Sequence, residues 1–290
     1  MSQPGPRVVA LGGGHGLAAS LRAVRRYAGE VTAIVSVADD GGSSGRLREA
    51  LGIAAPGDLR RCLVALAADE HSRWARAFEH RFEAGELEGH ALGNLVIAGL
   101  AGSEGDFRAA LDECERLLGT VGRVLPATST PVVLKAEAAG GSVEGQVAVA
   151  ASDRISAVSL VPPDPEPPPE AVEAIAGADQ VVVGPGSLFT SVLAVLTVPG
   201  LRRALTETRA RTVYVCNLRP QPPETTDFDG AAHVEALHAH GFTPDVVVCD
   251  PAWLPPGDMA APRVERSVGR ADGIAHDPAR LAEALRELID

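Results

Sequence analysis

The chain has 290 residues, of which 46% are hydrophobic and only 3% aromatic, and it carries a formal net charge of -12. The hydrophobic fraction predicts a globular protein with a large core and excludes a disordered chain. The negative charge argues against a protein that binds nucleic acid through a broad basic surface. We therefore expect no nucleic-acid partner, although local donors can still hold a small anionic ligand.

Cysteine spacing and hydropathy bear on the cellular compartment. The four cysteines are scattered, with no CxxC pair, which is typical of free thiols in a reducing compartment rather than of disulfides or a zinc site (Cys62, Cys114, Cys216 and Cys249). No apolar run approaches the length of a membrane span, and the N-terminus lacks the pattern of a secretion signal. We expect a cytoplasmic protein without a membrane span.

The first 50 residues predict a βαβ unit. Residues 7–11 (RVVAL) read as a strand, GGGHG as a turn, 17–27 as a helix and 30–37 (EVTAIVSV) as a second strand. Such a unit implies a parallel sheet with a right-handed crossover. A loop rich in glycine and serine, Gly41 to Arg46, is expected to follow.

The rest of the chain continues the α/β pattern after an interruption. Helical periodicity covers residues 56–119, and 132–138 with 142–150 resemble a hairpin; the proline-rich 161–170 is a linker or a surface loop. Strand, turn and helix then recur at 180–196, with strands at 212–218 and 245–250 and a closing helix at 278–289. We predict one α/β domain over residues 1–290: a three-layer α/β/α, Rossmann-like parallel sheet with an inserted helical and hairpin segment at 57–165.

Two glycine-rich turns each follow a predicted strand, at Gly12–Gly16 and Gly184–Ser191. Glycine lets backbone N–H groups approach a phosphate, and the N-terminus of the following helix adds partial positive charge. In open α/β sheets ligands bind at the carboxyl ends of the strands. Two such turns at one edge predict a split anion site, although tight turns also use glycine for steric reasons alone.

The stretch VADDGGSSGRLR ends the second strand with two adjacent carboxylates. Because successive strand residues face opposite sides, only one of the pair can face a ligand. We expect Asp40 to do so, accepting hydrogen bonds from sugar hydroxyls or holding Mg²⁺ if that ion is used, while Asp39 anchors the loop. Ser43, Ser44 and Arg46 would supply donors to an anion.

A competing interpretation is a dinucleotide site. Gly14, Gly16 and Ala19 match the pattern G-x-G-x-x-A, and Asp39 lies about where a ribose-binding acid belongs. That would make the protein an NAD(P)-dependent oxidoreductase. The second aspartate and the loop behind it have no role in such a site, which weakens this interpretation.

Further polar groups follow predicted element ends, and each also has a purely structural explanation. HALGNL is expected to place His90 and Asn94 one helical turn apart, and PGDLR places Asp58 in a first helical turn, where an acid is often a cap. CNLRPQPPET places polar side chains directly after a strand (Asn217, Gln221, Glu224 and Thr225).

These strings together resemble the YvcK-type gluconeogenesis factors of the CofD-like (UPF0052) family. The resemblance runs in order from about Val8 to His276 and rests on GGGHGL, VADDGGSSGRLR, PGDLRRCLVALA, HALGNL, VLPATSTPV, VVVGPGSLFTSVL and CNLRPQPPET. The sibling branch, 2-phospho-L-lactate transferase, does not carry the ADDGGSSGR loop. This chain therefore resembles the YvcK branch more closely. A transferase of a nucleotide-activated phosphoester is kept as the alternative function, because the two branches share the fold and the nucleotide-binding edge.

The resemblance implies a cytoplasmic bacterial protein that binds UDP-N-acetylglucosamine and is needed for growth on gluconeogenic carbon sources, for cell shape and for peptidoglycan precursor supply. It implies a regulator without an established reaction, a homodimer, and an amino-sugar biosynthesis enzyme as partner. Carried over by position, the nucleotide-sugar site would comprise Gly12, Gly13, Gly14, His15, Gly16, Asp39, Asp40, Gly41, Gly42, Ser43, Ser44, Arg46, Asn94, Gly184, Pro185, Gly186, Ser187, Asn217, Gln221, Glu224, Thr225 and Phe228.

The chain departs from the family pattern at several of these positions. His15 stands where the family usually has threonine, Pro223 replaces a glycine, and Ala232 replaces an aspartate. Phe228 stands where tyrosine is common; it could stack on a uracil ring but cannot donate a hydroxyl hydrogen bond. These motifs require no cofactor, and they leave Mg²⁺ open as a bound ion.

Overall fold

A seven-stranded parallel sheet forms the centre of the protein, whose computed structural model describes residues 5–289. The spatial order is β10-β9-β8-β7-β1-β2-β3, and each neighbouring pair is parallel. The strands are β1 (Arg7–Gly12), β2 (Glu30–Val35), β3 (Arg123–Pro126), β7 (Gln180–Val183), β8 (Arg211–Val215), β9 (Val246–Cys249) and β10 (Arg263–Glu265).

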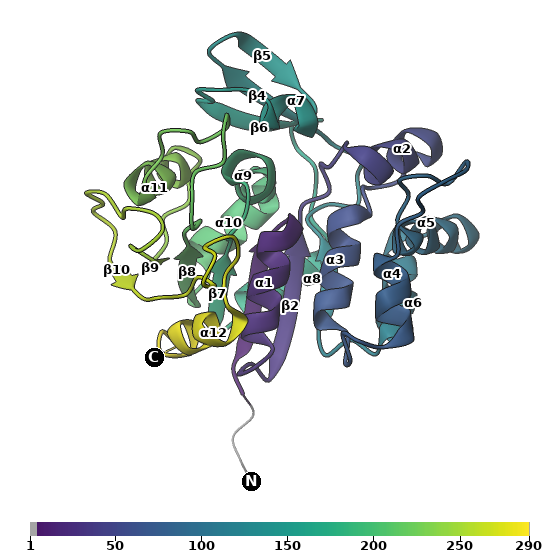
Figure 1. Ribbon diagram of the computed structural model, residues 1–290, viewed down its shortest axis with the longest axis horizontal. Coiled ribbons are helices and arrows are strands. Elements are labelled where there is room, and N and C mark those ends of the chain that lie inside the picture. The colour runs from purple at the N-terminus through teal and green to yellow at the C-terminus, as the bar shows by residue number, and fades with distance from the viewer. Residues whose placement is uncertain (1–4, 290) are drawn as a thin grey trace.

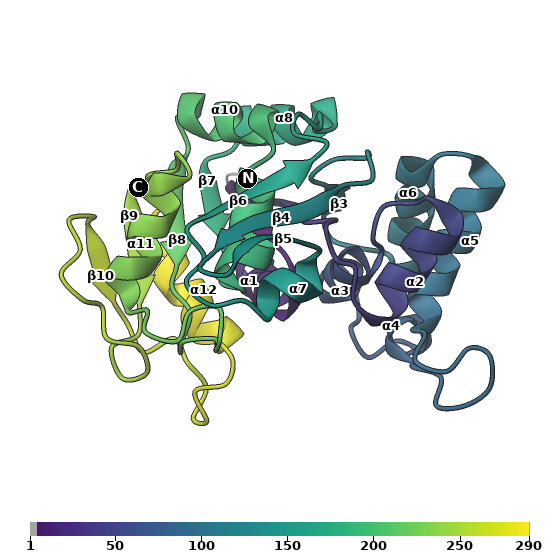
Figure 2. The ribbon, with the colours of Figure 1, turned by 90° about the horizontal axis from the view of Figure 1, so that it is seen from above.

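Helices cover both faces of this sheet (Figures 1 and 2). The central strands are short apolar runs buried along nearly their whole length, and such strands need a helical layer on each side. One layer contains α1 (Gly14–Val24), α3 (Gly57–Leu66) and α12 (Pro278–Arg286); the other contains α8 (Pro169–Ala176) and α10 (Pro199–Glu207). The predicted three-layer α/β/α fold is confirmed.

A second, three-stranded sheet lies above the carboxyl edge of the main one (Figure 1). It contains β4 (Val133–Ala138), β5 (Gly141–Glu144) and β6 (Ala157–Val161). The short helix α7 (Gln146–Ala150) lies between β5 and β6 in the chain. The expected hairpin strand 142–150 is thus wrong beyond Glu144, because Gly145, at φ +98°, turns the chain into α7. The range 57–165 also contains β3, a strand of the main sheet, whose four residues are too few to show a strand pattern.

The expected loop at Gly41–Arg46 is instead the first part of a helix, α2 (Gly42–Leu51). Glycines and serines dominate its first turn, so propensity alone favoured a loop there. His90 and Asn94 are not one helical turn apart, since α5 (Leu92–Glu104) begins only after His90. Gly89, at φ +78°, and the extended Ala91 hold His90 outside the helix.

The remaining helices lie beside or above the sheet. They are α4 (Arg73–Glu79), α6 (Phe107–Leu118), the π-helix η1 (Leu188–Val192), α9 (Leu193–Leu196) and α11 (Gly230–Ala239). Among residues 5–289, no single helix has both the length and the apolar character of a membrane span. One pair of consecutive helical segments, 188–196 and 199–207, would together be long and apolar enough, but they are bent by 74° relative to each other.

Candidate functional site

The two glycine-rich turns meet at the point where the strand order reverses. From β1 the chain proceeds to β2 and β3 on one side, whereas β7 is followed by β8, β9 and β10 on the other. This is the switch point at which open α/β sheets bind ligands. A Cβ added at Gly16 would overlap the carbonyl group of Pro185, so the two turns touch through bare backbone. The sequence therefore placed both turns at the correct edge.

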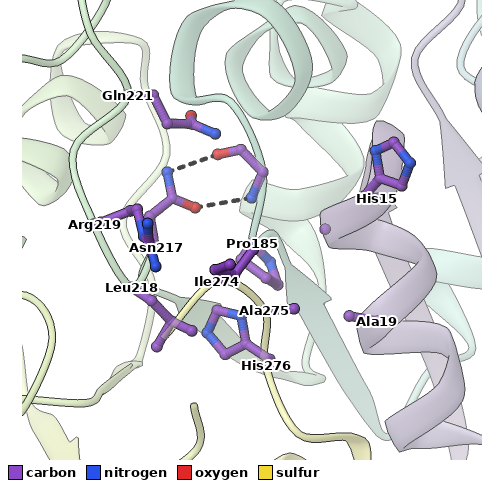
Figure 3. A pocket seen from close by; sticks show the side chains of 12 residues that line it. His15, Ala19, Pro185, Asn217, Leu218, Arg219, Gln221, Ile274, Ala275 and His276 are labelled. Carbon is purple, nitrogen blue, oxygen red and sulfur yellow. Dashed lines mark hydrogen bonds between the residues drawn. The ribbon is translucent and has the colours of Figure 1, made fainter. Parts of the chain in front are cut away.

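Asn217 and Glu224 hold the second turn from behind. The Asn217 amide binds Gly186 twice, its Oδ1 accepting from the Gly186 N–H at 3.0 Å and its Nδ2 donating to the Gly186 carbonyl at 2.8 Å (Figure 3). The buried Glu224 carboxylate accepts from the Ser187 hydroxyl at 2.6 Å and from the Phe189 N–H at 2.7 Å. Burial raises the pKa of Glu224, while these donors oppose the rise. Both side chains act as supports of the turn.

A cavity of about 160 Å³ lies on one side of the turns (Figure 3). His15 and Ala19 of α1 face it from one wall, and the loops after β7, β8 and β10 form the others. The Arg219 guanidinium donates to the carbonyls of Asp272 and Gly273, which fixes the loop carrying His276 against the site. We name this the switch-point cavity; its lining is His15, Gly16, Ala19, Pro185, Gly186, Asn217, Leu218, Arg219, Gln221, Ile274, Ala275 and His276.

Both histidines of this cavity favour the neutral form. Partial burial and the nearby Arg61 lower the pKa of His15. Burial lowers the pKa of His276 to about 4, and its Nε2 lies 3.1 Å from the Cys216 carbonyl, to which it donates. At neutral pH the two imidazoles therefore add no positive charge to that of Arg219, and His276, whose Nε2–H is used by the Cys216 carbonyl, has only its acceptor nitrogen Nδ1 left.

His276 predicts an acid-sensitive stability. Because its pKa is about 4 in the folded state and 6.5 for the free side chain, the unfolded state binds the proton more tightly, and stability falls as pH drops from about 6.5 to 4. At pH 5 this costs about 2 kcal/mol relative to neutral pH. Urea unfolding at pH 7.5 and pH 5 should show His276→Gln losing about 2 kcal/mol less than wild type. The exposed control His71→Gln should follow wild type; equal losses in all three would refute the assignment.

A larger, polar cavity of about 350 Å³ lies on the other side of the first turn. Three arginines and two aspartates line it together with hydroxyl, amide and glycine positions, so it suits a ligand that combines anionic groups with hydroxyls. We name this the polar cavity; its lining is Gly14, Asp39, Gly41, Gly42, Ser43, Ser44, Gly57, Asp58, Arg60, Arg61, Arg81, Asn94, Gln146 and Ser191.

Asp58 joins this cavity to the first glycine turn. Its Oδ2 accepts from the Gly14 N–H at 2.7 Å, and its Oδ1 binds the Arg61 guanidinium at 2.7 Å. Burial raises the pKa of Asp58, with Arg61 opposing the rise. The residue therefore does not cap its own helix, whose N-cap is Pro56 without a side-chain bond. Asp58 instead fixes the first glycine turn through Gly14. The expected role as a helix cap gave no indication of this contact.

A chain of buried hydrogen bonds fixes the polar cavity at α2. The Ser43 hydroxyl lies 3.0 Å from His90 Nδ1 and accepts from Asn94 Nδ2 at 3.0 Å. Asn94 Oδ1 in turn accepts from Arg60 Nε at 3.1 Å, and Arg60 binds Glu79 at 2.6 Å. HALGNL and PGDLR, far apart in sequence, thus meet in one network that orients the Ser43 hydroxyl.

Of the adjacent aspartates, Asp39 has the loop-anchoring role expected of it, whereas Asp40 is engaged away from the polar cavity. Asp40 Oδ1 accepts from the Val147 N–H at 2.9 Å, which ties the small sheet to the end of β2. Asp39 lines the polar cavity, and its Oδ1 accepts from the Gly41 N–H at 2.9 Å. If a cation is held here, Asp39 is better placed than Asp40.

Three other expected residues, Arg46, Phe228 and Thr225, line neither of these cavities. Arg46 donates from Nη2 to the Glu88 carbonyl at 2.7 Å and lines a neighbouring pocket. Phe228 packs edge-on against Phe189 and His233, with ring centroids 6.1 and 5.6 Å away, so its ring supports the core. Thr225, also expected at the site, accepts from the Gln221 N–H at 2.8 Å and stabilises the loop after β8.

Within residues 5–289, no group of three or more histidine, cysteine, aspartate or glutamate side chains could hold a metal ion. Mg²⁺ is commonly bound by one or two carboxylates together with substrate phosphates. Asp39 fits that partial role, whereas both Asp58 oxygens already have partners. The donor set therefore suits Mg²⁺ only as an ion shared with a bound diphosphate.

The fold and the paired turns define the protein as a doubly wound α/β protein with the strand order of dinucleotide-binding sheets. The sequence profile of the family described as 2-phospho-L-lactate transferase CofD matches residues 8–289. The chain belongs to the CofD family.

Relatives within this family are named as gluconeogenesis factors. The chain is 43% identical over 249 residues to the gluconeogenesis factor of Bacillus subtilis, covering 84% of this chain and 78% of that one. A Mycobacterium tuberculosis relative is 44% identical over 304 residues, covering 96% and 89%. A crystal structure of a UPF0052 family member from Bacillus halodurans superposes with a TM-score of 0.90 at 36% identity, covering 96% of this chain and 98% of that one.

Proposed function

We propose that the protein binds UDP-N-acetylglucosamine or a related nucleotide sugar and acts as a regulator during growth on gluconeogenic carbon sources. The observation that carries this proposal is the pairing of two glycine turns between two cavities of different character. A diphosphate placed over the turns would meet the N-terminus of α1 and those backbone N–H groups of the turns that Asp58 and Asn217 do not already engage. The nucleoside and the sugar would then occupy the cavities on either side.

The family membership supports the regulatory part of the proposal. Relatives of this chain carry the name gluconeogenesis factor, and we extend that role to cell shape and the supply of cell-wall precursors. In this proposal the bound state is read by an amino-sugar biosynthesis enzyme in the cytoplasm, and the protein acts as a homodimer.

We expect UDP-N-acetylglucosamine to raise the melting temperature, because a ligand that binds only the native state stabilises it by mass action. Calorimetric titration with UDP-N-acetylglucosamine, GDP, NAD and NADP, with and without Mg²⁺, measures this directly. Binding of the UDP-sugar alone supports the proposal. NAD or NADP binding without UDP-sugar binding would establish the oxidoreductase interpretation instead.

A glycine variant locates the ligand. Gly186 has φ +156°, and a Cβ there would lie 3.5 Å from the Gly13 carbonyl, between the two turns. Gly186→Val should therefore reduce UDP-sugar affinity below detection, because its methyl groups fill the phosphate position. Gly140→Val, in an exposed turn where a Cβ meets nothing within 4 Å, is the matched control. Equal affinities in folded variants would remove the turn from the site.

A transferase is the second candidate, and the description of the matching family model favours it. In that case the nucleotide-activated phosphoester would be consumed when an acceptor is present. Incubation of the protein with UDP-N-acetylglucosamine and a metabolite extract, followed by mass spectrometry, tests this. Release of UMP or UDP that is abolished in Asp39→Asn would establish turnover, and unchanged ligand would favour the regulator.

A further inference from the structure

A third pocket, of about 810 Å³, adjoins the polar cavity on the outer side of α2. Arg46 and Arg48 of α2 line one wall, and Arg81, after α4, lines the other; we name it the arginine pocket. Gly42 and Arg81 belong to the linings of both the arginine pocket and the polar cavity. A ligand in one therefore lies next to a ligand in the other.

The three arginines of this pocket have no carboxylate partner, unlike several arginines elsewhere in the described chain. Arg25, Arg60 and Arg61 each bind a carboxylate. Within the described part of the chain, the guanidinium groups of the arginine pocket form no such ion pair. Arg48 Nη1 is buried and has no hydrogen-bond partner in that part. Three guanidinium groups without a carboxylate partner, one of them with a buried unpartnered nitrogen, therefore converge on one pocket.

Backbone contacts hold two of these side chains in place. Arg46 Nη2 donates to the Glu88 carbonyl at 2.7 Å, and Arg81 Nη1 donates to the Gly89 carbonyl. Two carboxylates also line the pocket. Asp40 is engaged by the Val147 N–H, and Glu49 is exposed. The positive field reaches the neighbouring His90, whose pKa is lowered by burial and then by Arg46 and Arg81.

We propose that the arginine pocket binds the phosphate group of a second small molecule, beside the ligand of the polar cavity. Guanidinium groups bind phosphate oxygens in pairs of parallel hydrogen bonds, and several of them match a dianion with three terminal oxygens. The volume suits a phosphorylated metabolite rather than a lone ion. The protein then has two adjacent ligand sites, and this inference stands whether or not the first ligand is a UDP-sugar.

Phosphorus NMR tests the proposal with inorganic phosphate and glycerol 3-phosphate as probes, each titrated with and without saturating UDP-N-acetylglucosamine. We expect both probes to bind in its presence and the ester to bind more tightly than free phosphate. The double variant Arg46→Gln/Arg81→Gln, made at exposed side chains, should weaken binding at least tenfold. The matched control Arg116→Gln/Arg154→Gln removes two exposed charges elsewhere and should not change it.

A second readout localises the anion. Phosphate in the arginine pocket should raise the pKa of His90, measured by NMR of labelled histidine, and the double variant should abolish that rise. Equal probe affinity in the double variant and wild type, or complete displacement of the probes by the UDP-sugar, would overturn the proposal. If the UDP-sugar itself does not bind, the proposed function fails, and the comparison of the double variant with its control still decides this inference.

Discussion

Glu224→Ala is expected to cost about 3 kcal/mol or more of the free energy of unfolding. The variant leaves the buried N–H groups of Phe189 and Thr190 without their acceptor and frees the Ser187 hydroxyl. Each buried polar group left unsatisfied costs about 1–3 kcal/mol. The second glycine turn loses its support at the same time, so ligand affinity should fall with stability.

Two further variants make this measurement specific. Glu224→Gln retains an acceptor oxygen and should lose about 1 kcal/mol, whereas Glu235→Ala, an exposed glutamate on α11, should change stability by less than about 0.5 kcal/mol. Urea unfolding at pH 7.5 compares all three with wild type. A loss below 1 kcal/mol in Glu224→Ala would show that the carboxylate does not hold the turn.

The fold could be predicted largely from local patterns. Strands such as 180–183 and 246–249 are short apolar runs followed by turn residues, and this pattern marks buried parallel strands. β3 and β10 escaped prediction because runs of four and three residues carry too little periodicity. Residues 42–51 were assigned partly to a loop because glycine and serine propensities favour one, and packing of the buried Leu47 overrides them.

The site was predictable where it consists of backbone and not where it depends on side-chain direction. Both glycine turns lie at the edge that strand order requires. The sequence did not indicate that Arg61, Arg81 and Gln146 line the polar cavity. Their positions depend on how α3, the segment after α4 and α7 come together in the fold. His276 was missed for the same reason, since the loop after β10 reaches the site only through contacts with Arg219. The position of Asp58 in a first helical turn was noticed, but a role as a helix cap explained that position equally well.

The order of Asp39 and Asp40 illustrates what a sequence leaves open. Alternation along a strand predicts that two adjacent carboxylates diverge, but β2 ends at Val35, so the direction of each depends on the loop that follows the strand. In the structure that loop brings Asp40 to the N–H of Val147, far along the chain, and leaves Asp39 in the polar cavity. Asp40 therefore connects the small sheet to the main one, and Asp39 is the carboxylate available to a ligand.

Asp39→Asn should accordingly weaken nucleotide-sugar binding far more than Asp40→Asn. Asparagine at 39 still accepts from the Gly41 N–H through its amide oxygen, but the other oxygen becomes an NH₂ group that repels ligand donors or Mg²⁺. The expected loss is about 1–3 kcal/mol, or roughly 5- to 150-fold in affinity. Asparagine at 40 retains the bond to Val147, so its affinity should stay within about twofold of wild type.

Calorimetry of both variants with UDP-N-acetylglucosamine, with and without Mg²⁺, measures the difference in affinity. The two variants are matched, because the same substitution is made at adjacent positions of one loop. Urea unfolding of each variant confirms that affinity changes do not follow from lost stability. A loss in Asp39→Asn that appears only with Mg²⁺ would assign the carboxylate to a shared ion, and a loss under both conditions would assign it to ligand hydroxyls. If Asp40→Asn is the weaker binder, the polar cavity is not the sugar or ribose site, because the carboxylate that lines it would then make no contribution.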